Sequence, residues 1–215
     1  MAEAGSQTLA RGLTALALIG EADSPLTVPE LADELGIHRS MAYRLVRTLE
    51  QLGFVARAAD GGLEVGARVV ALARNVARDL RSAATPELVR LANDLGMTAF
   101  LVTYDGTEAV TLASVEPQRA DATVAQRPGS RHPIDRGAPG RVIRSQLDPV
   151  GFPPARFETS HDEVFVGLSS IAVPVTTASH APAALAVVYL THDLDAPALA
   201  AALEQAARRI EHALR

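Results

Sequence analysis

A group of arginines on one short segment is the clearest chemical feature of this sequence. Between Ile37 and Arg57 lie four arginines, at positions 39, 44, 47 and 57, against a single acid, Glu50. The preceding segment, Glu21 to Glu34, holds five acids and no base. A guanidinium group can donate paired hydrogen bonds to a phosphate or to the edge of a guanine. Although the net charge of the whole chain is −5, the positive charge is concentrated where a nucleic acid could be bound.

Helical geometry places most of these arginines on one face. At about 100° per residue, a helix that begins at His38 or Arg39 and runs to Leu52 has two opposite faces. Five apolar residues share the face expected to be buried: Ala42, Leu45, Val46, Leu49 and Leu52. The opposite face carries Ser40, Tyr43, Arg44 and Arg47. The usual explanation of such a polar face is simple solvation, so the neighbouring elements decide between the two interpretations.

The elements around this helix predict a winged helix-turn-helix. One helix is expected over Thr8 to Ile19. A second is expected over Val28 to Leu35, because Thr27 offers an N-cap hydroxyl, Pro29 stands in the first turn and Glu30 follows the cap by three residues. Gly36 suits the turn to the third helix. Two short strands, Phe54 to Arg57 and Leu63 to Val65, flank a glycine turn and form the wing. The expected DNA contacts are Thr27, Arg39, Ser40, Met41, Tyr43, Arg44, Arg47 and Arg57.

The rest of the chain alternates helices and strands, which predicts an α/β domain. A linker helix over Ala67 to Ser82 has an apolar stripe that suits self-association: Val69, Leu72, Val76 and Leu80. One short helix contacts few base pairs, so we expect a homodimer or a dimer of dimers. Further helices are expected at 86–95, 141–146 and 196–214, strands at 97–104, 108–115, 121–126, 169–176 and 183–190, and a loop at 127–140.

Composition excludes several classes of function. The chain has 215 residues, enough for two domains, with no cysteine and no lysine. The absence of cysteine excludes disulfides and thiolate metal sites, and the absence of lysine excludes Walker A loops and Schiff-base chemistry. The histidines lack metal-ligand spacing, and Ser160-His161-Asp162 is expected to be a polar loop, because consecutive side chains cannot converge as a hydrolytic triad. We expect no metal, no cofactor, no enzymatic activity, no membrane span and a cytoplasmic location.

Three blocks of the sequence resemble the IclR family of bacterial regulators. Ile37 to Leu49 resembles the family's Gly-Leu-x-x-Ser-Thr-x-x-Arg-Leu-Leu recognition helix. His132 to Arg141 resembles the loop and helix start beside the family's effector pocket, and Val166 to Val175 resembles its pocket strand. The resemblance implies an α+β fold: a winged helix-turn-helix DNA-binding domain at 1–66, the linker helix at 67–82, and a GAF/PAS-like effector-binding and oligomerisation domain at 83–215.

The resemblance also implies partners and a ligand site. The partners would be a double-stranded DNA operator and a small-molecule effector. The effector residues would be Leu101, Leu112, Arg136, Gly137, Ala138, Pro139, Gly140, Ser170, Ala172, Ala186 and Val188. Departures from the family pattern occur at Met41, where threonine is common, and at Ala186 and Val188, where some members carry serine. Pro139 supplies no N–H, and the segment between Arg144 and Glu158 is short.

These departures favour an apolar pocket, and hence an aromatic or medium-sized apolar acid over a small hydrophilic one such as glyoxylate. The Ser170 hydroxyl is equally consistent with a ligand donor and with a satisfied core hydroxyl. Three hypotheses follow: a ligand-responsive repressor or activator, a regulator whose sensor domain only oligomerises, and a small-molecule-binding enzyme.

Overall fold

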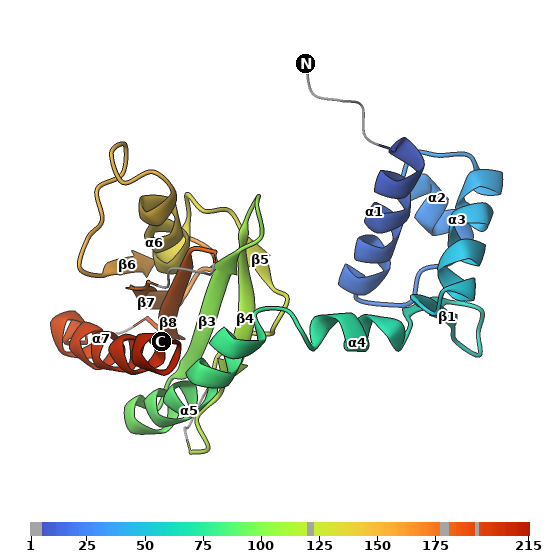
Figure 1. Cartoon of the computed structure of the whole chain (residues 1–215). Helices are drawn as coiled ribbons and strands as arrows, with labels where there is room; N and C mark the ends of the chain where they lie inside the picture. Colours follow the sequence, from blue (N-terminus) through green and yellow to red (C-terminus); the bar gives the residue numbers. More distant parts are fainter. Residues whose placement is uncertain (1–5, 120–122, 177–180, 192–193) are drawn as a thin grey trace. The chain divides into compact units, whose positions relative to one another are not determined.

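The computed structural model describes residues 6–119, 123–176, 181–191 and 194–215. They form two compact units, Met1–Val76 and Ala77–Arg215, and the division falls inside the predicted linker (Figure 1). None of the helices built from the described residues is both long enough and apolar enough to cross a membrane.

The first unit is a helix-turn-helix followed by a small hairpin. Its elements are α1 (Gln7–Glu21), α2 (Val28–Glu34), α3 (Arg39–Gln51), β1 (Val55–Arg57), β2 (Leu63–Val65) and α4 (Arg68–Ala73). All three predicted helices and both wing strands are present. The Leu63 N–H donates to the Leu26 carbonyl over 2.7 Å, which ties the hairpin to the α1–α2 connection. The buried core joins all three helices to the hairpin: Ala15, Ile19, Val28, Leu31, Ala32, Ala42, Val46, Val55 and Leu63.

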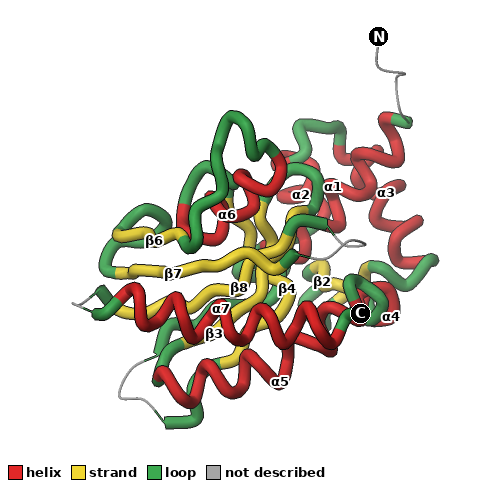
Figure 2. The backbone as a smooth tube through the Cα atoms, turned by 60° about the vertical axis from the view of Figure 1, so that its left-hand side comes forward, coloured by secondary structure: helices red, strands yellow, loops and turns green. Residues whose placement is uncertain are grey.

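The second unit is one antiparallel sheet with helices on both faces. Its strands are β3 (Thr98–Tyr104), β4 (Ala109–Val115), β5 (Arg131–His132), β6 (Glu158–His161), β7 (Leu168–Val175) and β8 (Ala183–Leu190), in the order β5-β4-β3-β8-β7-β6. Helices α5 (Arg78–Leu95) and α7 (Ala196–Ala213) lie side by side on one face, and α6 (Gly137–Leu147) covers the other (Figure 2).

Alternation along the central strands divides the core into two layers. Leu101, Ile171 and Leu185 pack against α5 and α7. Phe100, Ala172, Ala186 and Val188 pack on the α6 side. Because successive side chains point to opposite faces, a shift of one residue moves a side chain to the other layer.

The prediction of one continuous helix over Ala67 to Ser82 is wrong. Helix α4 ends at Ala73, and Ala77, with φ of 43°, has a left-handed backbone before α5 begins. The residues of the predicted apolar stripe lie in two different environments: Val76 is 53% exposed, whereas Leu80 is buried in the core of the second unit. No single packing partner therefore holds the stripe together as one helix.

The predicted break before Pro86 is also wrong, because α5 continues through this residue. Pro86 lies on the exposed side of the helix, where solvent can reach the carbonyl that loses its donor. Leu80, Ala84, Leu88 and Leu91 are buried along one face across the proline. Packing of this face outweighs the lost hydrogen bond.

Three smaller differences concern the second unit. Residues 123–126 of the predicted strand 121–126 are not a strand, and 121–122 lie outside the described residues; β5 pairs with β4 instead. Ser160 and His161 belong to edge strand β6, where a polar loop was expected, because they pair with Ser170 and Ser169 of β7. Helix α6 begins at Gly137, four residues before the predicted start, since Pro139 falls in its first turn, where a missing N–H costs little.

Candidate functional site

The exposed face of α3 carries unpaired positive charge. Ala42, Leu45 and Val46 are buried in the core, and the side chains opposite them are exposed. Among the described residues, Arg39, Arg44 and Arg47 have neither a salt bridge nor a side-chain hydrogen bond. Tyr43, which is 52% exposed, lies on the same surface. We call Arg39, Ser40, Tyr43, Arg44 and Arg47 the α3 face.

One residue expected on the buried side of α3 is misplaced. Leu52 is 53% exposed because it is the C-cap residue and lies beyond the last helical turn. The helical angle that predicts its burial does not apply past the cap.

Four of the predicted DNA contacts, Ser40 of the α3 face among them, already have partners within the chain. The Thr27 hydroxyl caps α2: it donates to Glu30 Oε2 over 2.7 Å and accepts from the Glu30 N–H. Ser40 Oγ lies 2.9 Å from His38 Nδ1, and Met41 Sδ accepts from Arg11 over 3.5 Å. In the wing, Arg57 Nε lies 2.7 Å from Glu50 Oε1.

A cavity of about 320 Å³ lies on the α6 side of the sheet. Its apolar wall includes Phe100, Val124, Phe165, Leu168 and Val188, and its polar wall includes Gln126, Ser130, Arg131, His132, Ser160, Ser169 and Ser170. Gly137 and Pro139, from the first turn of α6, also line the cavity. The volume suits a small organic molecule.

Only part of the predicted effector site lines this cavity. Gly137, Pro139, Ser170 and Val188 do. Ala138, Ala172 and Ala186 are buried in the core next to it. Gly140 is packed so closely that a Cβ there would lie 2.9 Å from the Pro133 carbonyl oxygen. Arg136 is exposed just before α6.

The prediction that Leu101 and Leu112 face the cavity is wrong. Both side chains pack with the α5 and α7 layer on the opposite face of the sheet. Leu101 has the opposite parity to Phe100, which does line the cavity. Leu112 falls at the register shift between β3 and β4, where simple alternation fails.

Sequence reasoning missed several lining residues. Phe100 and Ser160 could have been found from strand parity if the faces of the sheet had been known. His132, Val164 and Phe165 could not, because they come from loops or short edge elements. Their place at the cavity depends on how β5 and the β6–β7 connection fold back.

The hydroxyls of Ser160, Ser169 and Ser170 in the cavity lining are hydrogen-bonded within the chain. Ser160 Oγ and Ser170 Oγ lie 2.7 Å apart, and both side chains are buried. Ser169 Oγ lies 2.6 Å from His161 Nδ1 and 2.8 Å from Thr191 Oγ1. Ser170 is therefore a satisfied hydroxyl that also lines a cavity.

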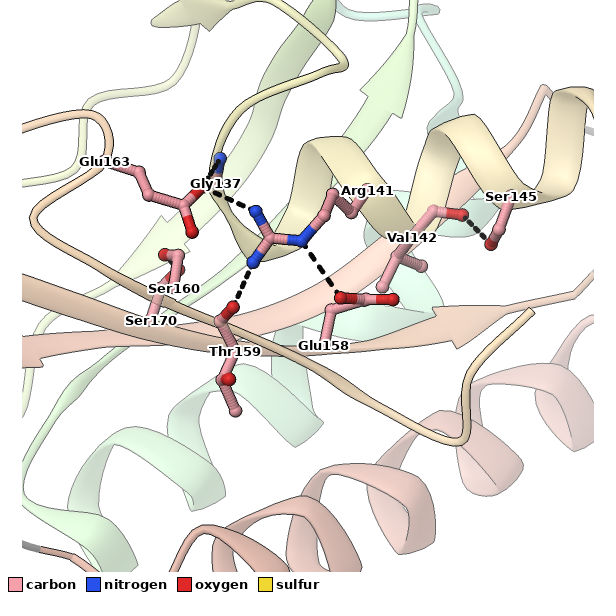
Figure 3. Close-up of polar contacts among 9 residues, drawn as sticks. All are labelled: Gly137, Arg141, Val142, Ser145, Glu158, Thr159, Ser160, Glu163 and Ser170. Carbon is pink, nitrogen blue, oxygen red and sulfur yellow. Dashed lines mark hydrogen bonds and ion pairs between the residues drawn. The ribbon is translucent and has the colours of Figure 1, made fainter. Parts of the chain in front are cut away.

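An ion-pair network lies at the start of α6, next to Gly137 of the cavity lining (Figure 3). Glu163 Oε2 accepts from the Gly137 N–H over 2.9 Å and from Arg141 Nη1 over 2.5 Å. Arg141 Nε donates to Glu158 over 3.0 Å, and Arg141 Nη2 donates to the Thr159 carbonyl. Burial acts to raise the pKa of Glu163, but the hydrogen bonds from Arg141 and Gly137 have the larger combined effect. The pKa of Glu163 is therefore lowered from its usual value.

Two further groups define the electrostatics of the cavity. Arg131 pairs with Asp105 over 2.8 Å and with Glu108 over 2.9 Å. Burial lowers the pKa of His132, and Glu108 offsets this only in part. His132 Nε2 is buried and has no hydrogen-bond partner within the described chain. In that same part of the chain, no three potential ligands gather into a metal site.

Sequence comparisons agree with the first unit. Residues 8–59 match the family model of the IclR helix-turn-helix domain. Relatives include the HTH-type transcriptional regulator KipR of Bacillus subtilis, 30% identical over 57% of this chain and 49% of the relative. The acetate operon repressor of Salmonella typhimurium is 29% identical over 66% of this chain and 53% of the repressor. The alignments span about half the length of these two curated relatives.

Solved structures share the whole fold. An IclR transcriptional regulator from Alicyclobacillus acidocaldarius superposes with a TM-score of 0.83 at 22% identity, covering 96% of this chain and 98% of that one. An IclR homologue from Microbacterium hydrocarbonoxydans, complexed with 4-hydroxybenzoate, gives 0.81 at 21% identity, covering 97% and 99%.

Together, fold and sequence define a winged-helix protein joined to an α/β domain of the kind found in bacterial transcription regulators. Residues 8–59 are thus similar to the IclR helix-turn-helix domain, and the whole chain shares the fold of solved IclR regulators, in line with the three sequence blocks.

Proposed function

We propose that this protein is a cytoplasmic transcription regulator that binds duplex DNA through the α3 face. The observation that carries the proposal is the set of unpaired guanidinium groups of Arg39, Arg44 and Arg47 on the exposed side of the second helix of a helix-turn-helix. In this geometry α3 enters the major groove, and the hairpin of β1 and β2 contacts the flanking phosphates.

We further propose that the protein binds DNA as a homodimer or a dimer of dimers. One recognition helix reads only a few base pairs, so useful specificity needs two copies on a palindromic site. Exposed apolar side chains offer a surface for self-association on α1 and near α4: Leu9, Leu13, Val70, Leu72 and Val76. Of the predicted stripe, Leu80 is unavailable, because it is buried in the second unit.

The cavity of the second unit supports a small-molecule effector. A ligand that favours one arrangement of the regulator would change its affinity for the operator. Whether binding represses or activates transcription depends on where the operator lies. An enzymatic role is the less favoured alternative: Ser169 Oγ does lie 2.6 Å from His161 Nδ1, but the same hydroxyl also contacts Thr191 Oγ1, and the neighbouring acid, Asp162, accepts from the Gly167 N–H.

Selection of bound duplexes from a random pool tests the proposal. We expect an enriched palindrome whose half-sites lie one helical turn, or a multiple of one, apart. The affinity for that palindrome should fall steeply with salt, because phosphate contacts release counterions. Enrichment of no sequence, with the protein folded, would contradict the DNA-binding role. A regulator whose second unit only oligomerises would bind the palindrome but respond to no compound in a thermal-shift screen.

A further inference from the structure

At the first turn of α6 a helix end presents N–H groups beside the cavity, and a carboxylate of the chain itself takes the first of them. The Gly137 N–H donates to Glu163 Oε2, and Pro139, two residues on, has no N–H to offer. Arg141 holds the same carboxylate oxygen over 2.5 Å. Glu163 thus occupies the position that a ligand carboxylate would take at a helix N-terminus.

The arginine that lines the cavity and the arginine of the ion-pair network are both already paired. Arg141 pairs with Glu158 and Glu163. Arg131, which lines the cavity, pairs with Asp105 and Glu108. Two guanidinium groups therefore contact four carboxylates, so these two sets of ion pairs carry an excess of negative charge next to the cavity. Burial lowers the pKa of His132, so this neighbour stays neutral near pH 7 and does not restore the balance.

The remaining polar groups suit neutral partners. Ser160 and Ser170 present hydroxyls that can donate or accept, and Gln126 and Ser130 add an amide and a further hydroxyl. Phe100, Leu168 and Val188 supply apolar contact for a ring. A carboxylate moved into this environment would be desolvated near Glu163, and the arginine of the lining, Arg131, already holds two carboxylates, so the transfer is costly.

We propose that Glu163 is the specificity-determining residue of this cavity: it excludes carboxylates, and the effector is an uncharged, hydrogen-bonding molecule with an apolar ring. This inference rests on the proposed function, because it names the ligand class of the same cavity. It differs from the aromatic or apolar acid expected from the sequence, because Glu163 already takes the Gly137 N–H at the start of α6.

A matched pair of compounds tests the inference. Calorimetry on the full chain compares 4-hydroxybenzamide with 4-hydroxybenzoate, which differ in charge but hardly in shape. The wild type should bind the amide at least about tenfold more tightly, the size of effect expected for a modest unfavourable charge contact. Glu163→Ala should bind the acid more tightly than the wild type does, because it frees the Gly137 N–H and Nη1 of Arg141, which keeps its bonds to Glu158 and Thr159. Glu163→Gln should lie between them, since its amide oxygen can still accept from Gly137.

The control is Glu204→Gln. Glu204 lies on α7, away from the cavity, and its carboxylate is paired with Arg156. It should leave the ratio of the two affinities unchanged. Tighter binding of the acid than of the amide by the wild type would overturn the inference. So would binding of neither compound by any variant at millimolar concentration. Duplex binding measured on the same samples is independent of both results, so a failed ligand class is distinguishable from a failed regulator.

Discussion

The two units of this protein use the same side chain in opposite ways. On the α3 face, Arg39, Arg44 and Arg47 are exposed, and the described residues provide them with no partner. Beside the cavity, Arg131 and Arg141 each hold two carboxylates of the same unit. An unpaired guanidinium is available to an external anion, whereas a paired one fixes loops in place. The number of arginines alone therefore does not locate a binding surface. What locates it is whether each arginine already has a partner within the chain.

The largest effect should come from the unpaired arginines. Arg44→Ala and Arg47→Ala should each weaken operator binding by about 1–3 kcal/mol, because each removes a base or phosphate contact. Loss of a base contact should relax specificity, and loss of a phosphate contact should weaken all duplexes alike. Titration of labelled operator by fluorescence anisotropy measures both effects.

The control for these variants is Arg208→Ala, an exposed arginine of α7 in the other unit. It should bind operator like the wild type, and the unfolding midpoints of all three variants should match the wild type. Normal operator affinity in both α3 variants would remove the recognition-helix assignment.

A paired arginine should affect stability before anything else. Arg141→Ala leaves Glu158, Glu163 and the Thr159 carbonyl without their donor. We expect a loss of about 1–2 kcal/mol in the free energy of unfolding, after allowance for the partial exposure of the pair. Arg141→Lys keeps the positive charge but lacks the paired N–H groups of a guanidinium, so its loss of unfolding free energy should be intermediate. Urea denaturation measures both variants, and an unchanged midpoint for Arg141→Ala would show that the network does not hold the β6–β7 connection.

Arg57 sharpens the comparison, because it belongs to the DNA-binding unit yet is paired with Glu50. Arg57→Ala should weaken operator binding less than Arg44→Ala does. The free energy of unfolding should change by about 0–1 kcal/mol, as expected for an exposed ion pair. Glu50→Gln should free Arg57 and strengthen binding slightly at low salt. If Arg57→Ala proves as harmful as Arg44→Ala, the pair must open on DNA.

The smallest effect is a dependence of stability on pH. The pKa of Glu163 is lowered, since the bonds from Arg141 and Gly137 outweigh the effect of burial. A carboxyl group whose pKa is lower in the folded than in the unfolded state stabilises the fold at pH values above the unfolded-state pKa, here near 4.5. This contribution is lost as the pH falls through the folded-state pKa. The difference in unfolding free energy between the wild type and Glu163→Gln should be constant from pH 7 to about 5.5 and shrink toward lower pH. A difference that grows on acidification would contradict the sign of this shift.

Local patterns predict the first unit well. Caps and turns lie within a few residues of what they cap: Thr27 and Glu30 form the expected capping box, and Gly36 and Gly53 have the positive φ expected after α2 and α3. The hairpin strands, β3, β4, β7, β8 and α7 also fall within about two residues of their predicted bounds, the usual uncertainty of helix and strand ends.

Long-range packing explains the errors. The helix across Pro86 persists because Leu80, Ala84 and Leu88 share a buried face, which local propensity does not reveal. The helix across Ala77 breaks because Val76 and Leu80 meet different environments. In the sheet, the pattern around Leu101 shows a strand buried on both faces, and such a strand carries no mark of which face holds the cavity.

The sequence by itself determined the winged helix-turn-helix, the four long strands of the second unit and the exposed charge of α3, because each depends on periodicity and capping within about a dozen residues. Only the tertiary structure decided which side chains line the cavity and that Glu163 fills the start of α6. Glu163 and Gly137 are 26 residues apart in the chain. Their contact depends on how β6, β7 and α6 pack together, and no local pattern records that.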